Sequence, residues 1–461
     1  MTLPETRFAK TEDGLNIAYQ RFGSGPDLVF VHRFVMTIGY IWDLPPSARF
    51  FGRLAEFCRV LAFDPRGTGL SDRRLREPDL SLERRMSDLA AVLDAEGLEH
   101  ASLLGSEDGG SLSALFAATH PERVDRLVLH ATFACGTARD DFPWMWTVDE
   151  WNAQIDETLR RWDDPEWLYE QGRGIAPAAL ADTDSLYRAV NLYRFGADPM
   201  TAATMFRIQR DLDIRSILPS IQAPTLILHP GAAPEEVFGP LEISRYLAER
   251  IPTARLVEVP GADFEIYSGN SDGVLEEIEE FVHGTRGARV DSHRALTTVL
   301  FTDIVGSTAK AASVGDARWK DLLAEHDARA REQLARFAGR EIDRAGDGFF
   351  ATFDGPARAV RCAFAIGDAV RPLGVEIRAG CHTGEVEYVG QQVRGIAVHI
   401  GARVAAMAGP TEVWTSSTVK DLTAGSGLAF IEGGEYELKG VPDHWHLYRV
   451  DRASSPEGGN R

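Results

Sequence analysis

The stretch TTVLFTDIVGST at Thr297–Thr308, together with the turn RAGDGFF at Arg344–Phe350, decides the fold of the second part of this chain. Each of the two follows an apolar, strand-like run and contributes one aspartate, Asp303 or Asp347. A turn of small residues follows Asp303 and opens a helical pattern of roughly thirty residues. The order strand, turn, helix, hairpin is therefore the frame on which the rest of this region is built.

The two aspartates lie at positions suited to a charged ligand. Backbone N–H groups at a strand-to-helix turn point toward an anion, and the helix dipole favours phosphate there. Asp347 stands in a Gly-Asp-Gly turn between strand-like runs at 340–342 and 349–353, which predicts a hairpin tip. Two carboxylates beside a phosphate-binding turn indicate Mg²⁺ or Mn²⁺ held on a nucleoside triphosphate.

Composition limits the class of protein. The chain has 461 residues, enough for two or three domains, and 44% of them are hydrophobic. Its net charge of −20 argues against nucleic acid and anionic membranes as main partners. The 4 cysteines have no metal-binding spacing, the first ten residues are polar, and no apolar run approaches the ~20 residues of a membrane span. We therefore expect a cytoplasmic protein with reduced thiols.

The region Met1–Gly284 alternates strand-like and helical patterns, which predicts a mainly parallel sheet covered on both faces. The Trp-rich segment 131–218 interrupts the alternation and is interpreted as a helical lid. We expect strands at 27–32, 59–64, 101–105, 124–130, 224–229 and 255–259, and helices at 80–96, 111–120, 241–250 and 273–283.

The motifs DPRGTGLSD, ALFAATHPERV and IPTARLVEVPG, with the turn at Gly105–Gly110, resemble the α/β-hydrolase family over nearly this whole region. That family carries its nucleophilic serine in a Gly-x-Ser-x-Gly elbow. Here the nucleophile position is Glu107, and Ser106 stands one place early. The acid position falls near Ala233, and the position of the catalytic histidine is Phe264.

These departures predict a domain without serine-hydrolase activity, because no histidine replaces the missing base. The oxyanion loop, which normally reads His-Gly, has His32 followed by the bulky Arg33. A rearranged site that pairs Ser106 with an unplaced histidine stays open. We expect the remaining pocket to sense a small apolar or acyl ligand and to regulate the second domain.

Residues 285–294 are polar and glycine-bearing, which is typical of a linker. A second domain is expected over 295–450, followed by a disordered tail at 451–461. Its pattern predicts a β-α-β-β-α-β, ferredoxin-like α+β domain with helices on one face of the sheet. The expected strands are 297–303, 376–382, 385–389 and 412–415 with a closing pair near 430–438 and 445–450, and the expected helices are 356–371 and 395–408.

Five ordered motifs, FTDIVGST, GDGFFATFDGPARAV, IRAGCHTGEV, GIAVHIGARVAAMA and LKGV, resemble the class III nucleotidyl cyclases. The fusion as a whole resembles the lipase-like adenylyl cyclases of mycobacteria. The resemblance implies a homodimer with active sites at its interface, where one subunit provides the metal-binding aspartates and the other an arginine. It also implies two Mg²⁺ or Mn²⁺ ions per site.

Within that resemblance, Asp303 and Asp347 match the metal-binding pair, and Arg403 matches the arginine that stabilises charge on the α-phosphate. Lys439 matches a triphosphate-binding lysine. His399 replaces the asparagine that usually orients the ribose, and its i, i+4 spacing puts it on the helix face of Arg403. The phosphate-binding loop corresponds to Ile304, Val305, Gly306, Ser307 and Thr308.

Two base-reading positions depart from the adenine pattern. Asp343 stands where these cyclases carry a lysine, and Gln392 where they carry an aspartate. An ionised aspartate only accepts hydrogen bonds, which suits the N–H edge of guanine, whereas the fusion's resemblance points to adenine. The leading expectation is an adenylyl cyclase that converts ATP to cyclic AMP. Alternatives are a guanylyl or relaxed-specificity cyclase using GTP, a lipase or esterase with a nucleotide-binding regulatory tail, and a non-enzymatic sensor.

Overall fold

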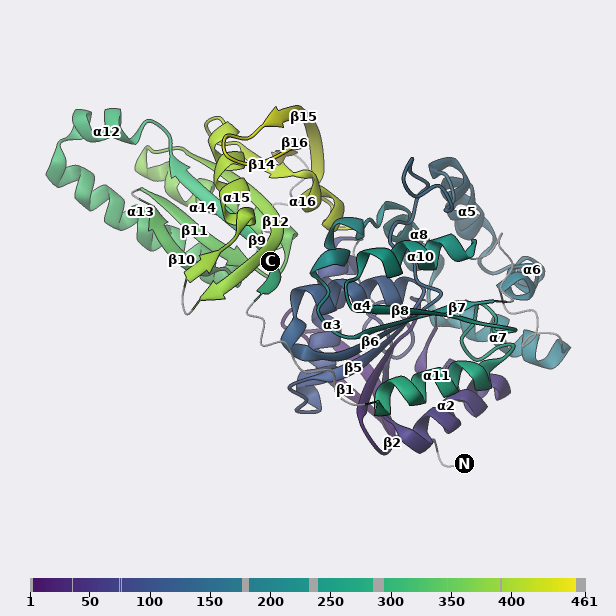
Figure 1. Ribbon diagram of the computed structural model, residues 1–461. Helices are drawn as coiled ribbons and strands as arrows, with labels where there is room; N and C mark the ends of the chain where they lie inside the picture. Colours follow the sequence, from purple (N-terminus) through teal and green to yellow (C-terminus); the bar gives the residue numbers. More distant parts are fainter. Residues whose placement is uncertain are drawn as a thin grey trace. The chain divides into compact units, whose positions relative to one another are not determined.

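The computed structural model describes residues 3–34, 36–73, 75, 77–175, 182–231, 239–284, 294–345, 347–389 and 392–452 of the chain. The chain divides into two compact units, Met1–Val290 and Asp291–Arg461, which are described separately (Figure 1). The expected linker and C-terminal tail fall almost wholly on residues outside the described ranges.

The first unit contains an eight-stranded sheet in the order β1-β2-β4-β3-β5-β6-β7-β8. The pairs β1–β2 and β2–β4 are antiparallel, and every following pair is parallel. The parallel strands β3, β5, β6 and β7 are buried, largely apolar runs, as the sequence predicts for a sheet covered on both faces, whereas the edge strand β8 is mostly partly exposed. The strands are β1 (Thr6–Lys10), β2 (Asn16–Gly23), β3 (Asp27–Val31), β4 (Arg59–Phe63), β5 (Ala101–Ser106), β6 (Val124–His130), β7 (Thr225–Pro230) and β8 (Ala254–Val259).

Helices cover both faces of this sheet. In Figure 1, α2 and α11 lie together on one side, and α3, α4 and α10 lie on the other. The helix pair α1 and α2 was not predicted from the sequence, whereas the other covering helices match the expected positions within a few residues. Their bounds are α1 (Ile38–Asp43), α2 (Pro45–Phe57), α3 (Leu82–Ala95), α4 (Asp108–Thr119), α10 (Leu241–Arg250) and α11 (Ser271–His283).

The Trp-rich insertion is helical, as predicted. It contains α5 (Val148–Arg161), α6 (Pro165–Ile175), α7 (Thr183–Gly196) and α8 (Pro199–Asp211). Thr147 and Glu150 form a capping box that starts α5. The buried Trp151 indole donates to the Gly136 carbonyl at 2.7 Å, so this helix is anchored to the core by a satisfied polar contact.

The second unit has a mixed sheet in the order β10-β11-β9-β12-β14-β16-β15, and β13 pairs with β12 as a hairpin. β9 and β12 run antiparallel along most of their lengths, from Ile377 opposite Ile304 to Glu387 opposite Arg294. The strands are β9 (Arg294–Ile304), β10 (Arg340–Ala345), β11 (Gly348–Phe353), β12 (Ile377–Val389), β13 (Gln392–Arg394), β14 (Val413–Ser416), β15 (Ala429–Glu437) and β16 (His444–Asp451).

Helices lie on both faces of this second sheet, so the expectation of helices on one face is wrong. Leu300 of β9 joins the core under α13 (Asp316–Arg336) and α14 (Pro356–Val370), whereas Val299 and Phe301 face the other way. α15 (Ile396–Met407) packs on that second face, where a Cβ added to Gly401 would lie 2.5 Å from Val299 Cγ2. Successive apolar residues of β9 thus pack against helices on opposite faces of the sheet (Figure 1).

Two further expectations are corrected. The roughly thirty-residue helix is two helices, α12 (Ser307–Val314) and α13, because Gly315 between them adopts a left-handed φ of 81°. The two strands expected at 376–382 and 385–389 are one, β12, since its long pairing with β9 carries it through Gly384. A short helix, α16 (Ser417–Leu422), follows β14.

Candidate active site and degenerate hydrolase site

Asp303 and Asp347 lie at the ends of neighbouring strands. β11 pairs antiparallel with β9, with Phe350 opposite Phe301, so the hairpin tip falls beside the end of β9. A Cβ added to Gly348 would lie 2.0 Å from the Thr302 carbonyl oxygen and 3.4 Å from the Asp303 Cα. Only glycine permits this approach, which brings the residue after Asp347 directly against Asp303.

The two carboxylates differ in their partners. Asp303 Oδ2 accepts from Arg378 Nε at 2.9 Å and from Arg378 Nη2 at 2.6 Å. Asp347 Oδ2 is buried and has no hydrogen-bond partner. An unpaired carboxylate oxygen in the interior lowers the stability of the fold. Its presence here indicates a cationic or hydrogen-bonding ligand at this atom.

The residues present fit a divalent cation. Two aspartates on adjacent strand ends provide hard oxygen donors, which Mg²⁺ and Mn²⁺ prefer. Groups of three or more His, Cys, Asp or Glu side chains that could hold a metal do not occur among the described residues. The remaining ligands would therefore come from backbone, water or a bound phosphate, as is usual for Mg²⁺.

Arg378 is a site residue that sequence reasoning missed. It lies on β12 directly opposite Asp303 of β9 and holds that carboxylate with both nitrogens named above. The signal was present, because Arg378 belongs to the motif IRAGCHTGEV. Only the strand register, which the sequence does not specify, reveals its partner.

The turn after Asp303 has the geometry of an anion-binding loop. Ile304 is buried and Val305 N donates to the Glu376 carbonyl at 2.9 Å, which fixes the start of the turn. Gly306 has a left-handed φ of 66° and precedes α12. The amides of Ser307 and Thr308 belong to the first helical turn, whose N–H groups have no partner inside the helix.

A second group of predicted residues gathers around α15. Arg403 and His399 are both exposed on this helix. Arg403 Nε donates to the Lys439 carbonyl at 3.1 Å. Leu438, next to Lys439, is buried against Ile400 of the same helix, so Arg403 and Lys439 are held together.

The two groups lie on different elements of the second unit. Asp303 ends β9, whereas Lys439 follows β15 at the far edge of the sheet, and β12, β14 and β16 lie between these two strands. Arg403 and His399 lie on α15, which packs on β9 and β12.

Asp343 and Gln392, the expected base-reading residues, are exposed. Asp343 Oδ1 accepts from the backbone N–H of Arg344 at 2.7 Å. Gln392 Oε1 accepts from Arg394 Nη2 at 2.8 Å, which leaves the Gln392 amide nitrogen to donate. The pair thus presents an acceptor at 343 and a donor at 392.

In the first unit, the turn between β5 and α4 keeps the strained geometry of a nucleophile elbow. Glu107 adopts φ 53° and ψ −122° at the tip of this turn. The flanking glycines allow the close packing: a Cβ on Gly109 would lie 2.2 Å from the Val31 carbonyl oxygen. Non-glycine residues adopt such a backbone only where the surrounding structure enforces it.

The Glu107 side chain is buried in an ion cluster. Arg33 Nη2 lies 2.8 Å from Glu265 Oε1, and Arg33 Nε lies 3.5 Å from Glu107 Oε1. The guanidinium also lies over the Tyr193 ring, 5.0 Å from its centroid. Glu265 was not singled out from the sequence, although it is an acidic residue directly after Phe264, where the base is missing.

One guanidinium serves two carboxylates in this cluster. Burial raises the pKa of Glu107 well above its ordinary value, and Arg33 offsets this only in part. Burial likewise raises the pKa of Glu265. The adjacent Asp108 has a cation of its own, since Arg85 Nη2 donates to its Oδ2 at 2.8 Å. The cluster therefore favours a shared proton over two full negative charges.

The other hydrolase positions lack catalytic partners. Ser106 lies opposite His130 in the β5–β6 register, but the described part of the chain shows no hydrogen bond between them. Burial lowers the pKa of His130 to about 3. Phe264 N donates to Asp263 Oδ1, so this carboxylate caps a turn. Ala233, near the acid position, lies outside the described residues.

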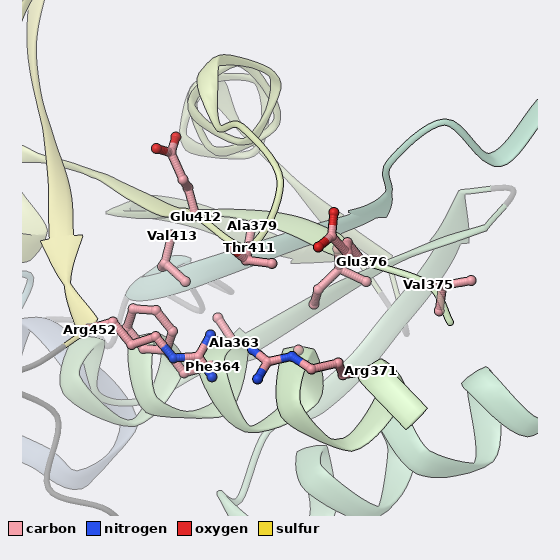
Figure 2. Close-up of a pocket in the computed structure, with 12 residues that line it drawn as sticks. Ala363, Phe364, Arg371, Val375, Glu376, Ala379, Thr411, Glu412, Val413 and Arg452 are labelled. Atoms are coloured by element: carbon pink, nitrogen blue, oxygen red, sulfur yellow. The ribbon is translucent and has the colours of Figure 1, made fainter. Parts of the chain in front are cut away.

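The second unit also has a shallow, open groove between α14 and the neighbouring ends of β12 and β14. Figure 2 shows the guanidinium groups of Arg371 and Arg452 facing each other over α14, while the carboxylates of Glu376 and Glu412 point away from the helix. Both arginines pair with Asp368. Neither Asp303 nor Asp347 lines this groove.

Comparison with known proteins identifies both units. A family model described as alpha/beta hydrolase fold matches residues 28–270, and one described as Adenylate and Guanylate cyclase catalytic domain matches residues 291–451. The chain belongs to the alpha/beta hydrolase fold family and carries a nucleotidyl cyclase catalytic domain. The match over residues 291–451 makes the second unit a nucleotidyl cyclase catalytic domain.

Individual proteins are similar to parts of this chain. The chain is 30% identical over 205 residues to a putative carbamate hydrolase RutD of Caulobacter sp. (strain K31), covering 44% of this chain and 72% of that protein. An esterase from Exiguobacterium antarcticum is similar in structure, with a TM-score of 0.53 and 25% identity. The match covers 60% of this chain and 99% of the esterase chain. Adenylyl cyclase CyaB from P. aeruginosa gives a TM-score of 0.34 at 19% identity. The match covers 36% of this chain and 100% of the CyaB chain. In the described residues, every helix is too short or too polar to cross a membrane.

Proposed function

We propose that the chain is an adenylyl cyclase that forms 3′,5′-cyclic AMP and pyrophosphate from ATP. The observation that carries this proposal is the pair Asp303 and Asp347 on adjacent strand ends, with Asp347 Oδ2 buried and unpartnered. When bound, Mg²⁺ or Mn²⁺ would lower the pKa of the ribose 3′-hydroxyl and neutralise the triphosphate.

The residues of the chain perform the remaining tasks. The amides of Ser307 and Thr308, in the turn Ile304–Thr308, bind phosphate oxygens and orient the chain of phosphates. The ribose 3′-oxygen loses its proton and bonds to the α-phosphorus, and the bond from that phosphorus to the pyrophosphate oxygen breaks. Arg403 stabilises the charge that develops on the α-phosphate, and His399 contacts the ribose.

We infer a homodimer from the resemblance to class III cyclases, in which one subunit provides the metal-binding aspartates and the other provides the arginine. In this chain β12, β14 and β16 lie between the strand that ends near Asp303 and the strand that precedes Lys439. A second copy that presents Arg403 and Lys439 to the aspartates of the first would complete the site. Two-fold symmetry would create two such sites.

A guanylyl or relaxed-specificity cyclase is the second candidate. The observation in its favour is the hydrogen bond from Arg394 to Gln392 Oε1, which leaves Gln392 as a donor beside the acceptor Asp343. Guanine offers the complementary pattern, with N–H donors and a carbonyl acceptor. The resemblance of the whole fusion to adenylyl cyclases keeps ATP as the first choice.

We further propose that the first domain lacks hydrolase activity and regulates the cyclase domain. Arg33, Glu107 and Glu265 form a buried ion cluster where a hydrolase has its nucleophile and base. Any ligand of this pocket would meet charged groups at its base, so we expect a ligand with polar groups in addition to the apolar or acyl part predicted from the sequence.

The test is product analysis of the full-length protein with Mn²⁺ and either ATP or GTP, read by chromatography. Cyclic AMP with an equal amount of pyrophosphate supports the leading proposal, and cyclic GMP formed from GTP in excess over cyclic AMP formed from ATP supports the second candidate. Nucleotide binding without turnover would favour a non-enzymatic sensor. Ester hydrolysis that disappears in Glu107→Gln or Ser106→Ala would instead favour a lipase or esterase.

A further inference from the structure

Both strands of the hairpin that presents Asp347 contact the same helix, α13. On the β10 side, Arg344 Nη1 lies 2.7 Å from Asp327 Oδ2 of that helix. On the β11 side, the Phe349 ring lies 5.8 Å from the ring of His326. The hairpin is thus held three residues before Asp347 and two residues after it.

The helix groups that hold the hairpin are buried. His326 is 0% exposed and Asp327 is 5% exposed. The second Asp327 oxygen, Oδ1, lies 3.2 Å from His326 Nδ1, so both carboxylate oxygens have a partner. A buried carboxylate needs such pairing, and removing the cation that pairs with it costs stability.

We propose that Asp327 is a positioning residue for the metal site, acting through Arg344 to set the place of the Asp347 carboxylate. This inference rests on the proposed function. Metal ligands must be held within a fraction of an ångström, and partners of the ligands typically contribute 10- to 100-fold to metal affinity. Asp347 comes from a hairpin tip, which by itself restrains a side chain less than a strand interior does.

The same helix and strand provide a matched control pair. Arg331 of α13 donates to Glu341 of β10 at 2.8 and 2.9 Å, but this pair lies six residues before Asp347. Both of its side chains are partly exposed, and such surface pairs contribute little stability. If the ion pairs only held α13 against β10, loss of either pair would weaken metal binding. If Asp327 positions Asp347, only loss of the Asp327–Arg344 pair should weaken it.

The experiment titrates Mn²⁺ alone into the full-length protein and follows the free Mn²⁺ signal by electron paramagnetic resonance. We expect Asp327→Asn and Arg344→Gln each to weaken binding about 10- to 100-fold, and the double variant to be no weaker than the worse single variant. Glu341→Gln should stay within about twofold of the unmodified chain. Melting curves of each variant establish that it is folded.

Wild-type affinity in Arg344→Gln, additive losses in the double variant, or an equal loss in Glu341→Gln would overturn the inference. If Asp327→Asn does not fold, Arg344→Gln tests the same contact from its partly exposed side. If the unmodified chain and Asp347→Asn remove no Mn²⁺ from solution at all, the metal site of the proposed function fails, and the positioning role fails with it.

Discussion

Individual side chains distinguish the proposed metal site of the second unit from the ion cluster of the first. Asp347 Oδ2 is a buried oxygen with no hydrogen-bond partner. Glu107 is a buried carboxylate as well, but Arg33 lies beside it and Glu265 competes for the same guanidinium. In our proposal the carboxylate of Asp347 binds a cation, whereas that of Glu107 pairs with charged groups of the chain itself.

The pairing at Glu107 predicts a pH dependence of stability. Because the pKa of Glu107 is raised in the folded state, the folded chain holds a proton that the unfolded chain releases above its ordinary pKa of 4.5. The contribution of this proton to the free energy of unfolding is complete below pH 4.5. It decreases as pH rises toward the pKa of the folded state, by up to about 1.4 kcal/mol per pH unit. Glu107→Gln should flatten this slope above pH 4.5.

Hydrogen exchange of β5 and α4 amides, corrected for the intrinsic effect of pH, measures this local stability in the full-length chain. Asp354→Asn, at an exposed aspartate of the second unit, provides the control. Parallel slopes in Glu107→Gln and the unmodified chain would contradict the proton-holding cluster.

The base-reading positions give a second prediction at this scale. Asp343→Lys with Gln392→Asp restores the donor and acceptor that suit adenine. Charge-assisted hydrogen bonds contribute about 1.5–3 kcal/mol, so the ratio of kcat/KM for ATP to that for GTP should rise more than about tenfold. Steady-state rates with both nucleotides measure the ratio. An unchanged ratio would mean that these side chains do not contact the base.

Among the elements, α15 determines where Arg403 and His399 lie. A Cβ on Gly401 would lie 2.5 Å from Val299 Cγ2, so Gly401→Ala forces the helix from the sheet. We expect a loss of about 1–3 kcal/mol in stability and a lower cyclase rate. Gly367 on α14 is the matched control, because its Cβ would lie at an ordinary 3.7 Å from Ile377.

Thermal unfolding of the two variants provides the comparison. Gly367→Ala should keep or raise stability, by about 0.5–1 kcal/mol, since alanine is favoured over glycine in a helix interior. Equal stability of Gly401→Ala and the unmodified chain would show that α15 does not pack as closely as described.

The elements were largely predictable from sequence, and the exceptions have physical causes. Periodicity placed α10 and β6 at their observed bounds. It could not detect the break at Gly315, where the backbone turns left-handed although helix-forming residues continue on both sides. It also missed that both faces of the second sheet are covered, because alternation along a strand does not say which face a later helix will occupy.

Site residues were predictable where local sequence creates the geometry. Asp303 and Asp347 are identified by the strands and turns around them. The contacts of Arg378 with Asp303 and of Arg33 with Glu265 join segments 75 and more than 200 residues apart, so only the folded chain reveals them.

For the whole molecule, the proposed dimer predicts complementation between inactive chains. Asp303→Ala and Arg403→Ala should each abolish most activity, because each removes one half of every site. In a mixed dimer one site combines both defects and the other is intact. Random pairing of equal amounts should restore about a quarter of the unmodified activity.

Co-expression of the two variants, with rates compared with each variant alone, measures this recovery. The absence of recovery in a preparation that contains mixed dimers would contradict a shared site and would favour a site built within one chain.

The central claim is that Asp303 and Asp347 hold a divalent cation for cyclisation. The most direct measurement is the rate of cyclic nucleotide formation with Mn²⁺ in full-length Asp303→Ala and Asp347→Ala, beside Asp354→Ala at an exposed position after β11. We predict a loss of more than about a hundredfold in the first two variants and little change in the third. Undiminished product from folded Asp303→Ala or Asp347→Ala would contradict the account.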